Sequence, residues 1–194
     1  NTMKQTLLII TALMLVVGCS SPEPINYETT LIERGRVFYT KDTDKPYSGP
    51  VFSLHKDGRK HWEGTLKDGK RDGKWWKEYE NGKKDVQIIY KDGKRHGLYN
   101  QWYENGQKWS EKKYKDGVPD GIHTWWYSNG QMREEGTFKD GEKDGKWTEW
   151  SGGEADGYVV PLPYHKSFEG TYKKGELIEG TYWDENGNVI EDEY

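Results

Sequence analysis

Glycine recurs at a fixed interval of 24 residues over about half of this chain. Four consecutive units open at Gly49, Gly73, Gly97 and Gly121, and the last of them closes at Gly145. A spacing this regular indicates a tandem repeat, in which one small structural unit is copied along the chain. The fold is therefore expected to grow by stacking like units rather than around one mixed core.

Each unit contains two dipeptides that favour tight turns. Asn-Gly and Asp-Gly pairs tolerate the positive φ angles that two-residue hairpin turns require. They stand in two registers: Asp57-Gly58, Asn81-Gly82, Asn105-Gly106 and Asn129-Gly130 in one, Asp68-Gly69, Asp92-Gly93, Asp116-Gly117 and Asp140-Gly141 in the other. Turns every 11 to 13 residues leave room for strands but not for ordinary helices. The spacing predicts four hairpins over residues 49–144.

The apolar side chains of this chain are largely aromatic. Ten tryptophans and 14 tyrosines stand among 194 residues, and aliphatic side chains are few. Each ring buries far more area than a valine, so rings can hold a thin sheet together. We therefore expect an all-β fold: an elongated, single-layer antiparallel β-meander rather than a two-layer sandwich.

Aligned on their first glycine, the units place aromatic rings at recurring positions. Side chains alternate between the faces of a strand, so rings at the third and seventh positions share a face and rings at the sixth point the other way. We assign the third, seventh and eighteenth positions mainly to packing: Trp75, Tyr79, Tyr90, Tyr99, Tyr103, Tyr114, Tyr127, Phe138 and Trp147. The sixth-position residues Trp102, Trp126 and Trp150 are candidate binding residues, because an exposed aromatic row is a potential interaction surface.

The N-terminus predicts a targeting signal. Lys4 precedes an apolar run, Leu7–Val17, that is too short to span a bilayer. The residues that end at Cys19-Ser20 resemble a bacterial lipobox, which implies that residues 1–18 are a lipoprotein signal peptide and that Cys19 is acylated. The resemblance implies a lipid anchor in the bacterial envelope, and Ser20 implies the outer membrane, facing the periplasm or the cell surface. Cys19 is the only cysteine, so it has no disulfide partner within the chain.

The segments on either side of the regular array differ from it. Residues 19–30 are expected to form a flexible tether, and residues 31–48 an N-terminal capping strand segment. After Gly145 the next matching glycine is Gly180, which predicts a fifth repeat over residues 145–179 that carries an inserted loop.

The inserted loop is assigned to residues 151–167. Its apolar residues Tyr158 and Tyr164 are further candidate binding residues, because loops can absorb insertions that carry specificity. Residues 180–194 are expected to form a terminal half-repeat, whose acidic end discourages edge-to-edge pairing of sheets.

No catalytic or metal-binding constellation is visible in the sequence. The nucleophile elbow, the zinc-protease helix and the phosphate loop are missing as motifs, and the five histidines occupy different repeat positions. Asp184, Asn186 and Asn188 fit a hairpin turn better than a calcium loop. Positive charge exceeds negative charge only slightly in residues 49–144, so a nucleic-acid partner is not expected. We expect a protein without enzymatic activity, metal or cofactor.

Several segments resemble a known repeat family. Glu63–Trp75, Glu135–Gly141 and Glu169–Gly175 look like MORN repeats, and the Trp-Tyr-x-Asn-Gly-Gln segments at 102–107 and 126–131 look like the bacterial variant of that repeat. The segments at 35–39 and 45–49 are similar to the start of YwqK-type antitoxins. The resemblance covers roughly residues 31–194. It implies an elongated sheet of hairpins that contacts proteins and sometimes phospholipids.

Three functions follow as hypotheses. The first is a non-enzymatic envelope lipoprotein whose repeat sheet docks an unidentified protein. The second is a module that binds cell-wall glycan or a choline-type ligand, because aromatic rings can stack on sugars. The third, an antitoxin or immunity protein that neutralises a toxin, comes from the family resemblance alone.

Overall fold

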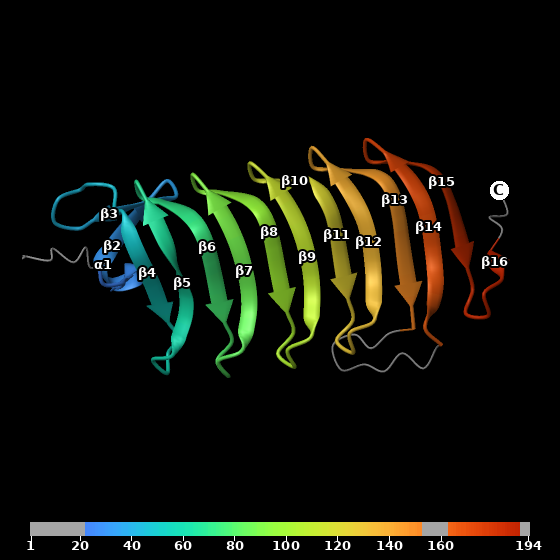
Figure 1. Cartoon of the computed structure of the whole chain (residues 1–194), viewed down its shortest axis with the longest axis horizontal. Coiled ribbons are helices and arrows are strands. Elements are labelled where there is room, and N and C mark those ends of the chain that lie inside the picture. Colours follow the sequence, from blue (N-terminus) through green and yellow to red (C-terminus); the bar gives the residue numbers. More distant parts are fainter. Residues whose placement is uncertain (1–21, 153–162, 191–194) are drawn as a thin grey trace, which may run out of the picture.

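The computed structural model of the protein describes residues 22–152 and 163–190. They form one long open sheet of 14 strands, with the hairpins side by side in chain order (Figure 1). Its main strands are β4 (Gly49–Leu54), β5 (Lys60–Lys67), β6 (Lys70–Glu78), β7 (Lys84–Lys91), β8 (Lys94–Trp102), β9 (Lys108–Lys115), β11 (Gly121–Trp126), β12 (Met132–Lys139), β13 (Glu142–Ser151), β14 (His165–Lys173) and β15 (Glu176–Trp183). The predicted all-β meander of tandem hairpins is confirmed.

Short strands complete the sheet. β1 (Ile25–Asn26) pairs with β4 in parallel, which is the one departure from antiparallel pairing among the described strands. β10 (Val118–Pro119) pairs with β9, and β16 (Val189–Ile190) pairs with the end of β15. β13 and β14 pair from Gly145 to Ser151, so the fifth hairpin keeps the repeat pattern on both sides of the expected insertion.

The turns along the upper edge in Figure 1 have the backbone conformation that their sequence predicts. The aspartates of the four Asp-Gly pairs, Asp68, Asp92, Asp116 and Asp140, have φ angles of 49°, 50°, 50° and 52°. The glycine that follows each of them is also at positive φ. Two consecutive left-handed residues characterise the type I′ turn, whose twist matches that of the flanking strands.

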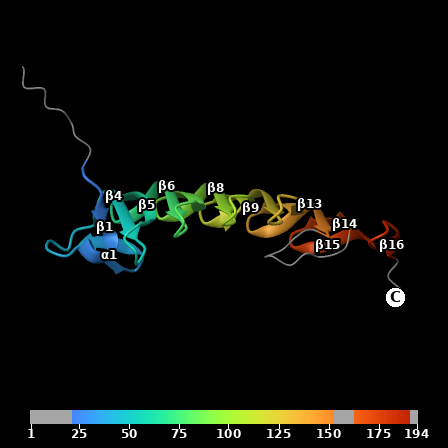
Figure 2. The same cartoon turned by 90° about the horizontal axis from the view of Figure 1, so that it is seen from below.

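The N-terminal segment packs against one face of the first hairpins, at one end of the sheet (Figure 2). α1 (Tyr27–Thr30) precedes a separate two-stranded sheet of β2 (Leu31–Arg34) and β3 (Val37–Thr40). The Tyr27 ring is buried and contacts the Phe38 ring at 5.6 Å and the Trp75 ring at 6.1 Å, measured between centroids. The structure differs here from the expected tether over residues 19–30, because Ile25–Thr30 is ordered by the burial of Tyr27.

The expectations for the targeting signal fall outside the described residues. Residues 1–21 include the predicted signal peptide and Cys19, and residues 153–162 include Tyr158. Within residues 22–152 and 163–190, no helix has both the length and the apolar composition needed to cross a membrane.

Candidate functional site

One face of the sheet carries a chain of aromatic contacts. We call it the ladder face, and it is defined by the third- and eighteenth-position residues of the repeats. Neighbouring ring centroids lie 4.5 to 6.3 Å apart, and the contacts in chain order are Trp75–Tyr90, Tyr99–Tyr114, Tyr114–His123, His123–Phe138, Phe138–Trp147 and Trp147–Tyr172. Such cross-strand ring pairs stabilise a sheet beyond the area that they bury.

Three third-position rings, those of Trp75, His123 and Trp147, also form hydrogen bonds with backbone carbonyls, whereas the Tyr99 hydroxyl donates to the Gln101 side chain. The Nε1 of Trp75 donates to the carbonyl of Thr65 at 3.0 Å, and that of Trp147 donates to the carbonyl of Thr137 at 3.2 Å. His123 replaces tryptophan in its unit, and its Nε2 lies 2.9 Å from the carbonyl of Lys113. Because a carbonyl only accepts, this geometry assigns the proton of the neutral imidazole to Nε2.

Glycines lie beneath the two third-position tryptophans, a feature that the sequence analysis missed. A Cβ atom at Gly64 would overlap the Trp75 ring, and one at Gly136 would overlap the Trp147 ring. Neither glycine has a positive φ, so the close approach of the ring explains the residue. The signal was present in the sequence, because each glycine precedes its tryptophan by 11 residues.

Basic side chains cover several rings of the ladder face. The Arg71 guanidinium lies 4.9 Å from the centre of the Trp75 ring, and the Arg95 guanidinium lies 5.3 Å from that of Tyr99. The Lys143 Nζ lies 3.7 Å from the Trp147 ring centre. These cation–π contacts leave little of the ring faces open to a ligand.

The opposite face presents the sixth-position tryptophans. We call it the row face, because Trp102, Trp126 and Trp150 follow one another on alternate strands and point away from the ladder. All three are half-buried. Lys108 is the register partner of Trp102, and its Nζ lies 5.5 Å from the centre of the next ring, Trp126. A lysine therefore lies between the first two tryptophans of the row, and Met132, the register partner of Trp126, lies between the second and the third.

Exposed aliphatic side chains extend the row face. Leu98 is 43% exposed and Ile122 is 61% exposed, and each lies four residues before a tryptophan of the row on the same strand face. Ile122 and Trp150 also line a shallow hollow of about 410 Å³, whose other walls are polar. The row face thus combines exposed apolar groups with charged ones, as protein-binding surfaces do.

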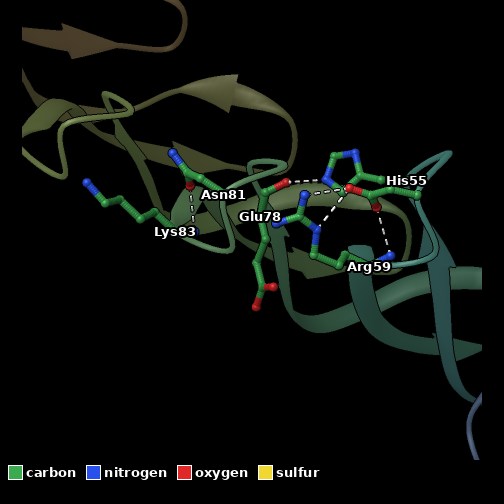
Figure 3. A network of polar contacts seen from close by, with 6 residues as sticks. His55, Arg59, Glu78, Asn81 and Lys83 are labelled. Atoms are coloured by element: carbon green, nitrogen blue, oxygen red, sulfur yellow. Dashed lines mark hydrogen bonds and ion pairs between the residues drawn. The ribbon is translucent and has the colours of Figure 1, made fainter.

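The seventh-position residues connect neighbouring repeats along the lower edge of the sheet. Tyr79, Tyr103 and Tyr127 donate from their hydroxyls to the carbonyls of Trp102, Trp126 and Trp150, at 2.6, 2.8 and 2.8 Å. In the first repeat a histidine replaces tyrosine: the His55 Nε2 lies 2.8 Å from the Glu78 carbonyl (Figure 3). These residues therefore fix the spacing of the backbone that carries the tryptophan row.

Of the loop predicted over residues 151–167, the structure describes residues 151–152 and 163–167. Ser151 belongs to β13 and residues 165–167 belong to β14, so the predicted loop is too long at both ends. Tyr164 is 38% exposed, and its hydroxyl donates to the Met132 carbonyl at 2.8 Å. This bond ties the end of the predicted loop to the same lower edge. Tyr164 lies 32 residues from that partner in sequence, so its position could not be derived from the repeat spacing.

Burial shifts the pKa values of several ladder-face groups. Burial lowers the pKa of His123 below its usual value of 6.5, and the positive charge of Lys112 acts in the same direction. Burial and the nearby Glu149 carboxylate raise the pKa of Glu134. These shifts belong to packed groups in an array, and in the described part of the chain no three His, Cys, Asp or Glu side chains gather to hold a metal ion.

Comparison with known proteins assigns two of these hairpins to a repeat type. Residues 95–116 and 119–140 match the family model of the MORN repeat variant, and no curated protein matches the chain. The first match spans β8 and β9, and the second spans β11 and β12. Two adjacent hairpins in the middle of the sheet are therefore similar to the MORN repeat variant.

Proposed function

We propose that this protein is a non-enzymatic lipoprotein of the bacterial envelope whose repeat sheet docks another protein on the row face. The observation that carries the proposal is the exposure of Leu98 and Ile122 on the same face as half-buried tryptophans, on an open sheet that places these groups at regular intervals. Contiguous apolar groups on a protein surface are typical of interaction sites. MORN repeats are themselves typically protein- or membrane-binding modules, which is compatible with a scaffold role.

A protein partner fits this face better than a stacked sugar. Stacking requires the open face of an aromatic ring, but the Lys84 Nζ lies 6.0 Å from the Trp102 ring centre and the Lys108 Nζ lies 5.5 Å from the Trp126 ring centre. The lysines at Trp102 and Trp126 leave ring edges and ammonium groups for contact at these two rings. Such a mixture suits the polar and apolar patchwork of a protein surface.

The anchor in this proposal is an acyl group on Cys19. Val16–Ser20 supports it through its lipobox pattern, and residues between Cys19 and Ile25 would link the lipid to the first strand. Because the lipid would hold the sheet at one end, the row face would lie parallel to the outer membrane or face away from it.

The proposal is tested by capture from envelope extracts. The chain from Ser20 to Tyr194 is immobilised, and proteins retained from detergent-solubilised envelope are quantified by mass spectrometry. We expect one protein to be retained in an amount near-equal to that of the immobilised chain. Ile122→Glu should abolish this retention, because it places a charge on the exposed centre of the row face. If the captured protein is a toxin, the result would support the antitoxin role, with the toxin bound on the row face.

The matched control is Val118→Glu. Val118 is 45% exposed and lies in β10 at the upper edge, away from the tryptophan row. Equal loss with both variants would show that added charge acts nonspecifically, which contradicts docking on the row face. Retention of glycan with no protein would support the ligand-binding alternative instead.

A further inference from the structure

Four basic residues gather where the N-terminal sheet meets the repeat sheet. One hollow of about 390 Å³ is lined by Arg36, Arg71, Lys94 and Arg95, with Tyr90 and two turn glycines. A second hollow of about 230 Å³ shares Arg36 and Arg71 with the first and continues over Phe38. We call the two together the basic groove.

Three separate parts of the chain build the basic groove. Arg36 projects from the turn between β2 and β3 and has a φ of 65°. Arg71 stands near the start of β6, and Lys94 and Arg95 stand at the start of β8. The N-terminal segment therefore adds one wall and a third guanidinium to a groove that the repeats alone would leave open.

The aromatic ladder orients two of the guanidinium groups. Arg71 lies over the Trp75 and Tyr90 rings at 4.9 and 5.7 Å, and Arg95 lies over the Tyr99 and Tyr114 rings at 5.3 and 5.4 Å. A guanidinium that rests on a ring keeps its N–H edges free to donate. The Arg71 guanidinium is thus held ready to form hydrogen bonds with an oxyanion, whereas the Arg95 guanidinium also contacts the Tyr90 and Tyr114 hydroxyls and adds its charge to the groove.

The positive charge of the groove is poorly compensated within the described residues. No ion pair there involves Arg36, Arg71, Lys94 or Arg95. Glu33 is the one carboxylate among the lining residues, and the buried Arg71 Nε has no hydrogen-bond partner in the described chain. Like charges held together in this way favour the binding of a complementary anion.

We propose that the basic groove binds an extended acidic segment of the partner protein. The groove lies on the ladder face beside the turns of the upper edge, so the acidic segment would reach it around that edge from a partner docked on the row face. The inference therefore rests on the proposed docking function and names the chemistry of the partner. An extended segment fits because the groove continues through two joined hollows and has an apolar floor at Phe38 and Tyr90, whereas a single small oxyanion would occupy a fraction of it. Arg71 and Arg95 lie on strands two apart, so successive carboxylates can meet successive guanidinium groups.

The test uses a short fluorescein-labelled peptide of alternating glutamate and glycine and the full chain in detergent. Fluorescence anisotropy at low salt should show saturable binding that weakens as salt is added, because screening acts on exposed charges. The double variant Arg36→Gly, Lys94→Ala should weaken the Kd by about tenfold or more. Glycine tolerates the positive φ at position 36, and both side chains are exposed, so the fold should be retained, as circular dichroism would check.

Two controls make the outcome decisive. Lys115→Ala removes one positive charge, as the Lys94→Ala half of the double variant does, from an exposed lysine on the same edge of the sheet and outside the groove, and it should leave the Kd unchanged. A peptide with glutamine in place of glutamate should not bind. Equal binding by the double variant and the parent protein would overturn the inference, as would binding of inorganic pyrophosphate without binding of the acidic peptide. If the inference fails while Ile122-dependent capture succeeds, the docking function stands with a partner of different chemistry.

Discussion

Gly136 is paired in register with His123 on one side and with Trp147 on the other. The size of the third-position ring and the size of the residue 11 positions earlier are therefore linked. Where the ring is tryptophan that residue is glycine, whereas Ile88 pairs with Tyr99. A larger ring at one of these two facing positions is thus matched by a smaller residue at the other, which keeps the packing of the ladder face close.

Gly136→Ala tests this link. The added Cβ would overlap the Trp147 ring, so we expect the free energy of unfolding to fall by about 1–3 kcal/mol, the usual cost of overpacking. Urea denaturation followed by tryptophan fluorescence measures the loss. Adding Trp147→Tyr should recover part of it, because Tyr99 coexists with a larger partner at the same register. If the two substitutions change the free energy of unfolding additively, the sizes of residues 136 and 147 are not linked.

His123 makes stability depend on pH. Its pKa is lowered in the folded state by burial, so below pH 6.5 the unfolded chain takes up the proton more readily than the folded chain. The free energy of unfolding should therefore fall as the pH drops below about 6.5, and the loss should level off below the folded-state pKa. Denaturation at pH 7.5 and 5.5 should show a smaller fall for His123→Tyr than for the parent protein. His61, whose pKa burial also lowers, would account for a remaining fall.

At the scale of the hairpin, each unit is joined to the next at both ends. Along the upper edge the turn glycines Gly93 and Gly117 donate to the carbonyls of Arg71 and Arg95, at 2.9 and 2.8 Å. Along the lower edge the seventh-position tyrosines bond the backbone of the following unit. The tryptophan row therefore sits on a backbone whose spacing is fixed from both sides.

Tyr127→Phe removes one of these links. The hydroxyl donates to the Trp150 carbonyl at 2.8 Å, and we expect its loss to lower the free energy of unfolding by about 1 kcal/mol. Thermal unfolding by circular dichroism measures the change. Tyr182→Phe is the matched control, because Tyr182 is 41% exposed and forms no hydroxyl hydrogen bond within the described residues. If Tyr182→Phe lowers the free energy of unfolding as much as Tyr127→Phe, the hydrogen bond from Tyr127 to the Trp150 carbonyl does not stabilise the array.

The hairpins themselves could be predicted from the sequence, because the Asx-Gly pairs fix where each turn falls and the strand period fixes which rings share a face. Two kinds of feature could not. The packing of Tyr27 beneath the first hairpins depends on the N-terminal segment folding back, which no local pattern specifies. The basic groove brings together residues as far apart in the sequence as Arg36 and Arg95. Both lie in lysine- and arginine-rich segments, which the sequence predicts to be solvated turns.

At the scale of the whole molecule the sheet is a one-dimensional array. Each described strand contacts its neighbours in the sheet order, so the stability of the array is approximately a sum of local terms. In hydrogen exchange, Gly136→Ala should accelerate the amides of β11 to β14 and leave those of β4 to β7 unchanged. Uniform acceleration along all strands would show global cooperativity instead.

Hydroxyl-radical footprinting of the captured complex shows whether the partner protein lies on the row face. Trp125 and Trp126 are adjacent and both half-buried, yet Trp125 contacts the Trp147 ring on the ladder face and Trp126 lies in the tryptophan row. A partner on the row face should lower the oxidation of Trp126 and leave that of Trp125 unchanged. Protection of Trp125 with an unchanged Trp126 would contradict docking on the row face.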